Sequence, residues 1–239
     1  MAWLAFFLAA LFALLVTILV PGQHRRQRLA ALAAKSVFVL ARINVDVVGI
    51  DKLPDENCVV VANHASYVDG FLLKGYLPAR FNFVIKGEMR DIPVAHFLLR
   101  RCGAKFVERN SHAGSARDAR QIVKAARDGE SLAFFPEGTF WKEPGVGRFR
   151  PGAFVAAVRG ELPVVPIAIS GTREMLPAGR MIPWPNSIKF QILPPITPDH
   201  PQFSDSRALA EAARQAILGA LDEPDLLQKT DTTRESASN

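Results

Sequence analysis

Short runs of consecutive apolar residues alternate along this chain with longer segments that have helical character. The runs 58–62 and 164–169 contain no charged residue, which is typical of strands that are covered on both faces of a sheet. Between them, residues 113–128 are expected to form a helix that ends at Gly129. This alternation predicts an α/β domain with a central, mostly parallel sheet flanked by helices.

The expected elements extend from residue 24 to residue 221, and a loop rich in Gly and Pro occupies 136–152. Strands are expected at 43–50, 58–62, 81–85, 104–107, 132–135, 164–169 and 187–193. Helices are expected at 24–42, 67–76, 91–101, 113–128, 154–158 and 204–221. We therefore divide the chain into an N-terminal membrane element at 1–42, a catalytic domain at 43–222 and a disordered polar tail at 223–239.

The first 20 residues carry no charged side chain, and Pro21-Gly22 follows them. A helix of that length reaches about 30 Å, which is enough to cross the hydrocarbon core of a bilayer. Basic residues come after this apolar run, which predicts that the following domain is cytoplasmic. Either the first helix spans the membrane and the helix at 24–42 lies on its surface, or the two form a hairpin in one leaflet. A cleaved targeting segment is the alternative, although no basic region precedes the apolar run.

The formal net charge of +6 is concentrated beside this N-terminal segment. Residues 1–42 hold five basic and no acidic side chains, so the remaining 24 basic and 23 acidic side chains leave only +1 for 43–239. A nucleic-acid-binding protein would carry its basic surface on the folded domain. The pattern instead favours anionic lipid headgroups, at about 1 kcal/mol per basic residue near the surface. The same basic surface could attract an acidic carrier protein.

The segment 63–69, NHASYVD, directly follows the expected strand 58–62. Side chains at the carboxyl ends of strands line the usual ligand crevice of an open α/β sheet. His64 can act there as a base near neutral pH, because the ordinary pKa of histidine is about 6.5. Asp69 could orient the imidazole, but five residues on a straight helix separate side chains by about 140°, so the pair needs a turn between them. The alternative is a surface histidine near a helix-capping aspartate.

Two further clusters also follow expected strands. Glu137, Gly138 and Thr139 come after the run 132–135, and backbone N–H groups in such a loop can bind an anion. The alternative is an ordinary turn in which Gly138 supplies the backbone angles. The cluster 164–173 is interpreted as a buried strand with a turn after it. The chain has no G-x-S-x-G, phosphate-binding loop, dinucleotide fingerprint or zinc-type spacing, so we expect no metal and no bound cofactor.

Taken together, these segments resemble the glycerolipid acyltransferase family, the 1-acylglycerol-3-phosphate acyltransferases. The resemblance covers roughly residues 43–195 and rests on four motifs in the family's order. They are N-H-x-x-x-x-D at 63–69, a basic middle motif at 86–109, F-P-E-G-T at 135–139 and V-V-P-I at 164–167. The two expected N-terminal helices also resemble the family's membrane-binding helix pair.

The resemblance implies a role for each matching residue. The family's base and its charge partner fall on His64 and Asp69, and the fourth motif is linked with the acyl chain and with packing. Contacts to the acceptor's phosphate are implied at Lys86, Arg109, Glu137, Gly138 and Thr139.

The chain departs from the family pattern immediately after F-P-E-G-T. Many lysophosphatidate enzymes have Arg at that position, and this chain has Phe140. Arg148 or Arg150, further along the loop, could supply the missing phosphate contact. The change leaves room for another lysolipid acceptor, such as a lyso-ornithine lipid or a lysophospholipid with a larger headgroup.

The implied reaction moves a fatty acyl group from acyl-CoA or acyl-carrier-protein to the sn-2 hydroxyl of 1-acylglycerol-3-phosphate, giving phosphatidic acid. Transfer would be direct, because no activated Ser or Cys nucleophile is evident. The implied partners are membrane lipids and the acyl donor, without nucleic acid, and the implied location is the cytoplasmic face of the cell membrane. An inactive lipid-binding protein and a hydrolase acting on the same lipids remain as alternatives.

Overall fold

A single sheet forms the centre of the protein, as the computed structural model shows for residues 8, 11–12, 14–16, 18–108, 112–140, 143–180, 182–184 and 186–228. Within these residues the sheet has seven strands in the order β1-β7-β6-β2-β5-β3-β4. Their bounds are β1 Val45–Val48, β2 Val59–Ala62, β3 Asn82–Lys86, β4 Lys105–Val107, β5 Leu132–Phe134, β6 Val164–Ser170 and β7 Ile188–Ile192. Each lies within one or two residues of a strand expected from the sequence.

The sheet is mostly parallel, as predicted. Strands β6, β2, β5, β3 and β4 run in one direction, because each pairs in parallel with its neighbour. Strand β7 is antiparallel to β6, and β1 is parallel to β7. The carboxyl ends of the five parallel strands therefore meet along one edge of the sheet, where ligands bind in open α/β folds.

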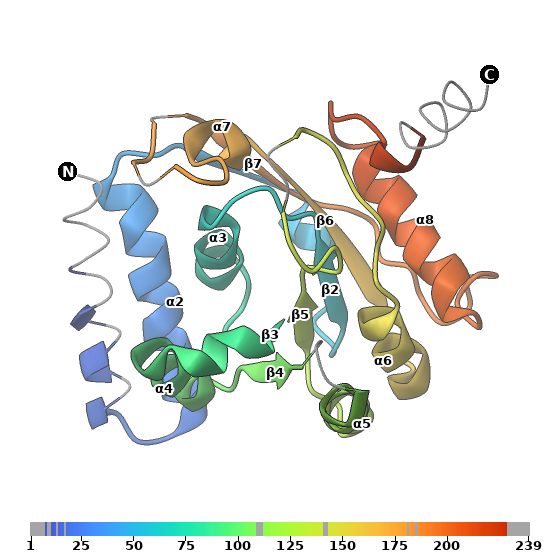
Figure 1. Ribbon diagram of the computed structural model, residues 1–239, viewed down its shortest axis with the longest axis horizontal. Coiled ribbons are helices and arrows are strands. Elements are labelled where there is room, and N and C mark those ends of the chain that lie inside the picture. The colour runs from blue at the N-terminus through green and yellow to red at the C-terminus, as the bar shows by residue number, and fades with distance from the viewer. Residues whose placement is uncertain are drawn as a thin grey trace.

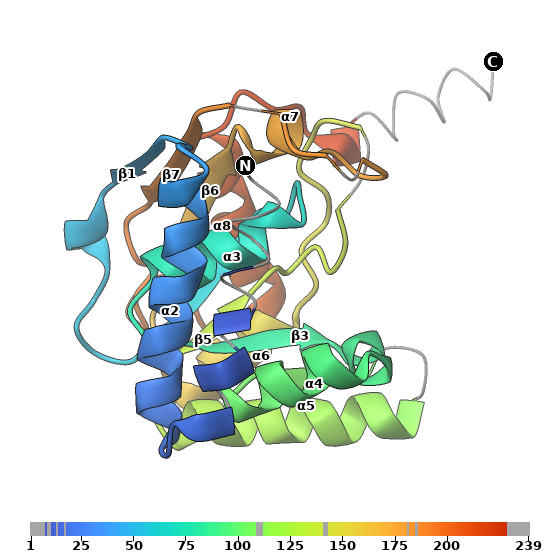
Figure 2. The same ribbon diagram turned by 90° about the vertical axis from the view of Figure 1, so that its left-hand side faces the viewer.

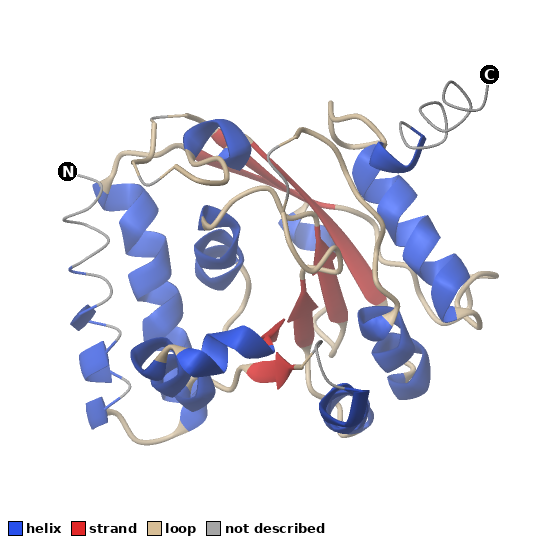
Figure 3. Ribbon diagram, in the orientation of Figure 1, coloured by secondary structure: helices blue, strands red, loops and turns tan. Residues whose placement is uncertain are grey.

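Helices cover both faces of this sheet (Figures 1 and 3). Their bounds are α2 Gln23–Leu40, α3 Val68–Tyr76, α4 Pro93–Arg101, α5 His112–Arg127, α6 Gly152–Gly160, α7 Thr172–Met175 and α8 Ser206–Leu218, with short 3₁₀ helices η1 Ile50–Lys52 and η2 Gly87–Asp91. Alternate residues of β2 show the division. Val59 and Val61 pack with α5, α6 and α8, whereas Val60 and Ala62 pack with α2 and α3. Each fully buried valine contributes about 1.5–3 kcal/mol.

Helix α2 is built into the core of the α/β domain. Phe38 is fully buried in the same cluster as Val60, and Gly75 of α3 allows a close approach, because a Cβ there would lie 2.9 Å from the backbone nitrogen of Lys35. Gln27 Nε2 also donates to Asn82 Oδ1 at 2.8 Å. The boundary that we placed after residue 42 is therefore not a boundary in the packing.

The expected membrane-spanning helix at 1–20 lies partly outside the described residues. Those of its residues that are described are helical up to Leu19, and several of their apolar side chains are exposed, namely Leu8, Leu11, Phe12, Leu15, Ile18 and Leu19. Among the residues that the structure describes, no helix is both long enough and apolar enough to cross a membrane.

The C-terminal boundary requires a correction. We expected a disordered tail from residue 223, but residues 223–228 dock against the loop that precedes α6. Val146 N donates to Pro224 O at 3.0 Å, and Gly145 N donates to the Glu223 carboxylate at 2.9 Å. The buried Arg214 holds Asp225 through two hydrogen bonds of 2.8 and 2.9 Å. These contacts offset the conformational entropy that residues 223–228 lose when they become ordered, a cost that the polar composition of the tail did not suggest could be met. Residues 229–239 lie outside the described part of the chain.

Candidate active site

The motifs singled out in the sequence meet at the carboxyl edge of the parallel strands. The chain leaves β2 at Asn63 and His64, leaves β5 at Phe135, and leaves β6 at Gly171. Strand β2 lies between β5 and β6, so their exit loops are neighbours in space although they are far apart in the sequence. Lys86 ends β3, the strand on the other side of β5.

Asn63 sets the direction in which the chain leaves β2. Its side chain is buried, and it pairs with the backbone of β6 as a strand residue would: Nδ2 donates to Ile169 O at 2.9 Å, and Ile169 N donates to Oδ1 at 2.8 Å. No role for this residue was predicted from the sequence. Its position directly after a fully buried strand was the available signal, since a buried amide requires partners.

His64 and Asp69 form the predicted pair. Asp69 lies in the first turn of α3, and His64 Nδ1 lies 2.9 Å from Asp69 Oδ2. The same oxygen accepts the backbone N–H groups of Ala65 and Ser66, at 2.7 and 2.8 Å, so these residues form the turn that the spacing required. Because a carboxylate can only accept, this bond places the imidazole proton on Nδ1 and leaves Nε2 as an acceptor.

The two members of the pair differ in their exposure. The Asp69 side chain is fully buried, whereas that of His64 keeps 18% of its surface accessible. A carboxylate near a helix N-terminus is stabilised by the N–H groups there. The result is a fixed negative charge behind an accessible imidazole, which can take a proton from a hydroxyl and hold it.

Aromatic rings fix the plane of the His64 imidazole. Phe135 stacks on it with ring centroids 4.2 Å apart and an interplanar angle of 17°, and Phe140 approaches edge-on at 4.7 Å. Tyr67 packs against Phe140 at 4.8 Å. Phe140, the residue at which this chain departs from the family pattern, therefore forms part of the wall around the His64 imidazole.

Glu137 links the loop after β5 to His64 and to a third segment. Its side chain is buried. Oε1 accepts the backbone N–H of His64 at 2.9 Å, and Oε2 accepts that of Gly147 at 3.0 Å. Burial raises the pKa of Glu137 above its usual range, and the N–H groups of His64 and Gly147 oppose that rise. This position suits a residue that holds two loops together; the substrate contact implied for Glu137 by the resemblance stays a prediction.

Gly138 turns the loop away from Glu137, with a φ of +80° that favours glycine, while Thr139 is half-buried beside it. Arg150 N donates to Pro136 O at 2.9 Å, so the segment that carries Arg150 runs beside this loop.

Basic side chains are the predicted contacts for the acceptor's phosphate. Those of Lys86, Arg148 and Arg150 are all exposed, and Arg109 lies outside the described residues. Their predicted phosphate contacts stay predictions. Among the residues that the structure describes, no three His, Cys, Asp or Glu side chains gather in a group that could hold a metal ion.

The residues that support the loop 145–147 were not predicted from the sequence either. The Glu223 carboxylate accepts from Gly145 N and from the buried Arg173, whose Nε lies 3.2 Å away. The next residues of that loop reach Glu137 through Gly147, and Glu137 reaches His64. A continuous series of contacts therefore joins the C-terminal segment to the backbone of the histidine.

An oriented, partly accessible imidazole at the strand ends of an α/β sheet is typical of enzymes that activate hydroxyl groups through a histidine base. Comparison with known proteins narrows this class. The acyltransferase family profile matches residues 44–170, which is more than half of the chain. The chain belongs to the acyltransferase family.

Individual relatives agree with this assignment. The chain is 32% identical over 146 residues to the chloroplastic 1-acyl-sn-glycerol-3-phosphate acyltransferase BAT2 of Brassica napus, a match that covers 60% of this chain and 42% of the relative. It is 30% identical over 185 residues to the lyso-ornithine lipid O-acyltransferase of Pseudomonas aeruginosa, covering 70% and 69%. The chain thus spans about two fifths of the length of the plant relative.

A solved structure shares the fold. The crystal structure of PlsC, the 1-acyl-sn-glycerophosphate (LPA) acyltransferase from Thermotoga maritima, superposes with a TM-score of 0.72 and 24% identity, and the match covers 92% of this chain and 96% of that one.

Proposed function

We propose that this protein transfers a fatty acyl group from a thioester donor to the free sn-2 hydroxyl of 1-acylglycerol-3-phosphate, giving phosphatidic acid. The observation that carries the proposal is the 2.9 Å contact between His64 Nδ1 and Asp69 Oδ2, which leaves Nε2 of an accessible imidazole as a base. Membership of the acyltransferase family and the name of the Brassica napus relative support this acceptor.

The reaction proceeds by direct transfer. Nε2 of His64 removes the proton of the acceptor hydroxyl while the oxygen attacks the thioester carbonyl, forming a C–O bond and a tetrahedral intermediate. The intermediate collapses by breaking the C–S bond, and the imidazolium returns its proton to the departing thiolate. Asp69 stabilises the imidazolium between these steps. A positioned base of this kind contributes about 10²- to 10⁴-fold to the rate.

Exposed basic residues hold the acceptor's phosphate. Lys86 stands at the end of β3, and Arg148 and Arg150 lie on the segment beside the loop after β5, so positive charge lines the same edge of the sheet as His64. Arg109 and the loop at 137–139 complete this set by resemblance. The phosphate contacts place the hydroxyl against the base. The donor is acyl-CoA or acyl-carrier-protein, and no metal or bound cofactor takes part.

A lyso-ornithine lipid is the second candidate acceptor. Phe140 occupies the position at which many lysophosphatidate enzymes have Arg, and it packs against His64 at 4.7 Å instead of offering a charge. The relative from Pseudomonas aeruginosa is named for that lipid. An uncharged wall beside the base suits an acceptor that has no phosphate at this point.

We place the enzyme at the cell membrane, with its catalytic domain on the cytoplasmic face. Exposed leucines of the described N-terminal helical residues support this location, because exposed apolar side chains on that scale mark contact with a lipid or a protein. Arg25 and Arg28, which follow them, are also exposed and suit anionic headgroups.

Acyl transfer from radiolabelled acyl-CoA and acyl-carrier-protein to a panel of lysolipids tests the proposal. His64→Ala is compared with wild type, and His200→Ala, an exposed histidine in the loop after β7, is the matched control. We expect phosphatidic acid from wild type and from the control but not from His64→Ala. Unchanged transfer in His64→Ala would overturn the mechanism, and acylation of lyso-ornithine lipid alone would replace the acceptor. Release of free fatty acid without an acceptor identifies a hydrolase, and lipid binding without turnover identifies a binding protein.

A further inference from the structure

Helix α4 lies at the surface with an unusual distribution of side chains. None of its nine residues is fully buried. Val94 is 60% exposed and Phe97 is 42% exposed, and Ile92, which immediately precedes the helix, is 51% exposed. Val94, Phe97 and Arg101 follow one another at helical spacing, so the outward face of α4 is apolar at its start and basic at its end.

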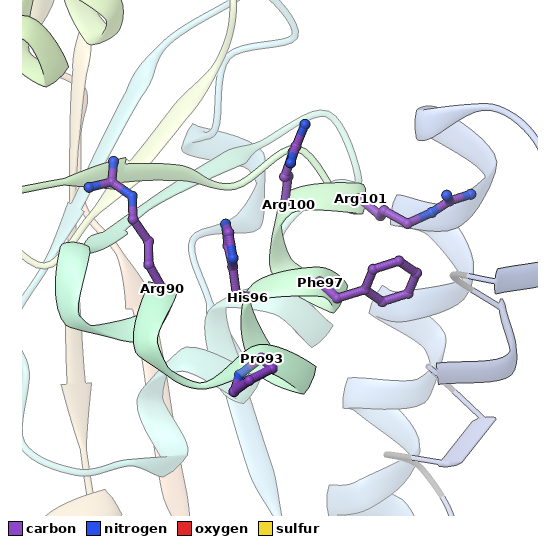
Figure 4. A pocket seen from close by; sticks show the side chains of 6 residues that line it. All are labelled: Arg90, Pro93, His96, Phe97, Arg100 and Arg101. Atoms are coloured by element: carbon purple, nitrogen blue, oxygen red, sulfur yellow. The ribbon is translucent and has the colours of Figure 1, made fainter.

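Arginines and a cavity border this apolar face. Figure 4 shows Phe97 and Arg101 extending to one side of α4, toward the N-terminal helices. His96 and Arg100 extend upward in this view, and Arg90 lies on the side away from the N-terminal helices. The guanidinium of Arg101 lies 5.5 Å from the centre of the Phe97 ring. A cavity of about 500 Å³ opens among six residues, Arg90, Pro93, His96, Phe97, Arg100 and Arg101.

The face of α4 continues onto the N-terminal helices. Arg26 Nε of α2 donates to Arg101 O at 2.9 Å, which joins the end of α4 to the start of α2. Leu8 and Phe12 of the preceding segment line a second, apolar cavity together with Leu32 and Leu40 of α2. Figure 2 shows these N-terminal helical residues, α2 and α4 on the same side of the molecule.

We infer that the outward face of α4 is a lipid-docking surface that lies in the interface of a bilayer containing anionic phospholipids. Ile92, Val94 and Phe97 enter the boundary between headgroups and acyl chains, and Arg100 and Arg101 bind headgroup phosphates. Exposed apolar side chains bordered by arginines match the two layers that a bilayer presents, an apolar interior below anionic headgroups. The continuity with the exposed N-terminal leucines favours a bilayer over a protein partner.

Docking through α4 would orient the active site as well as attach it. Helix α4 begins seven residues after Lys86, at the strand-end edge that also carries His64. A bilayer in contact with α4 therefore lies beside the residues that are proposed to hold the acceptor's phosphate. The inference rests on the proposed function in one respect, namely that the acceptor is a membrane lipid. Its test measures binding and needs no turnover.

The full chain is tested by co-sedimentation with vesicles of phosphatidylcholine alone and of phosphatidylcholine mixed with phosphatidylglycerol. Arg100→Gln combined with Arg101→Gln is expected to weaken binding to the anionic vesicles by roughly 30-fold at low salt, with little change on neutral vesicles. Arg159→Gln combined with Arg207→Gln removes two exposed arginines from α6 and α8, on the other face of the sheet, and serves as the control. Equal loss in both double variants would show a general charge effect and overturn the assignment to α4.

A second variant tests whether α4 itself enters the bilayer. This test works even if the N-terminal residues alone are enough to bind the protein to the vesicle. Phe97→Trp is expected to show blue-shifted emission, relative to wild type, that brominated lipid quenches, whereas Arg159→Trp on α6 is expected to show neither. If the emission of Phe97→Trp is not quenched although the protein sediments with the vesicles, the inferred lipid-docking surface is overturned. The exposed face of α4 would then be assigned to a protein partner. Acyl transfer in detergent micelles, measured in parallel, shows separately whether the proposed enzyme activity exists.

Discussion

The interior of the candidate site and its rim are built in opposite ways. In the interior, Asp69 and Glu137 are buried, and their oxygens accept two backbone N–H groups each, among them that of His64. At the rim, Lys86, Arg148 and Arg150 extend exposed side chains from a strand end and from a loop.

This difference between interior and rim indicates how substitutions in each part should affect the enzyme. Charges inside the protein act through a low dielectric and are fixed in place, so we expect the interior to control the chemical step. Exposed charges are screened by salt and can adjust, so we expect the rim to decide which acceptor is held and how tightly. Interior substitutions should therefore lower kcat, and rim substitutions should raise KM.

The largest effect is expected for Asp69→Asn. The amide keeps the shape of the side chain but removes the charge that supports the imidazolium, so kcat should fall by about 10²- to 10⁴-fold with little change in KM. Steady-state kinetics with the preferred acceptor measure this. Asp199→Asn, at an exposed aspartate, is the control. A loss of less than tenfold would remove Asp69 from the mechanism.

Glu137→Gln should have the next largest effect. Glutamine offers only one acceptor oxygen, so either His64 N or Gly147 N loses its partner; we expect a loss of about 1–3 kcal/mol in unfolding free energy and roughly tenfold in kcat.

The same variant tests the pH dependence of stability. Because burial raises the pKa of Glu137 in the folded state, wild type should lose stability as the pH rises from the ordinary value of 4.5 through the raised one. Denaturant unfolding at several pH values should show that this fall is missing in Glu137→Gln. An identical pH dependence in the two proteins would contradict the assigned shift.

Lys86→Ala, a substitution at the rim, should change KM without changing kcat. We expect KM for lysophosphatidate to rise by roughly tenfold while kcat changes by less than about twofold, because the lost contact holds the phosphate and not the reacting atoms. The effect should shrink as salt is added. Lys189→Ala, at an exposed lysine of β7, is the control. A fall in kcat with unchanged KM would place Lys86 in the interior group.

The smallest effect is expected for Glu223→Ala, which acts on the interior from a distance. Removing its bonds to Gly145 and Arg173 should loosen the loop that carries Gly147 and lower kcat by roughly threefold to tenfold, with KM unchanged. Glu223→Gln, which keeps one acceptor, should recover part of this loss. Unchanged kcat in Glu223→Ala would show that the C-terminal segment supports the fold without supporting the site.

The strands and most of the helices were predictable from the sequence because their signals are local. The apolar run 58–62 became β2 at Val59–Ala62, and the segment 113–128 became α5 at His112–Arg127. The pairing of His64 with Asp69 was also predictable, since five residues and one turn join them. The short helix α7 was missed, because four residues carry too little periodicity to be recognised.

By itself, therefore, the sequence determined the alternation of strands and helices, the positions of the motifs at strand ends, and the pairing of the proposed base, His64, with Asp69. Tertiary structure alone decided how that base is held. Asn63 finds its partner 106 residues away in β6, Glu137 reaches back 73 residues to His64, and the segment from Glu223 closes on a loop 78 residues earlier. No local pattern specifies such contacts, because each depends on which strands lie side by side, and that order is set by how the whole sheet buries its two faces.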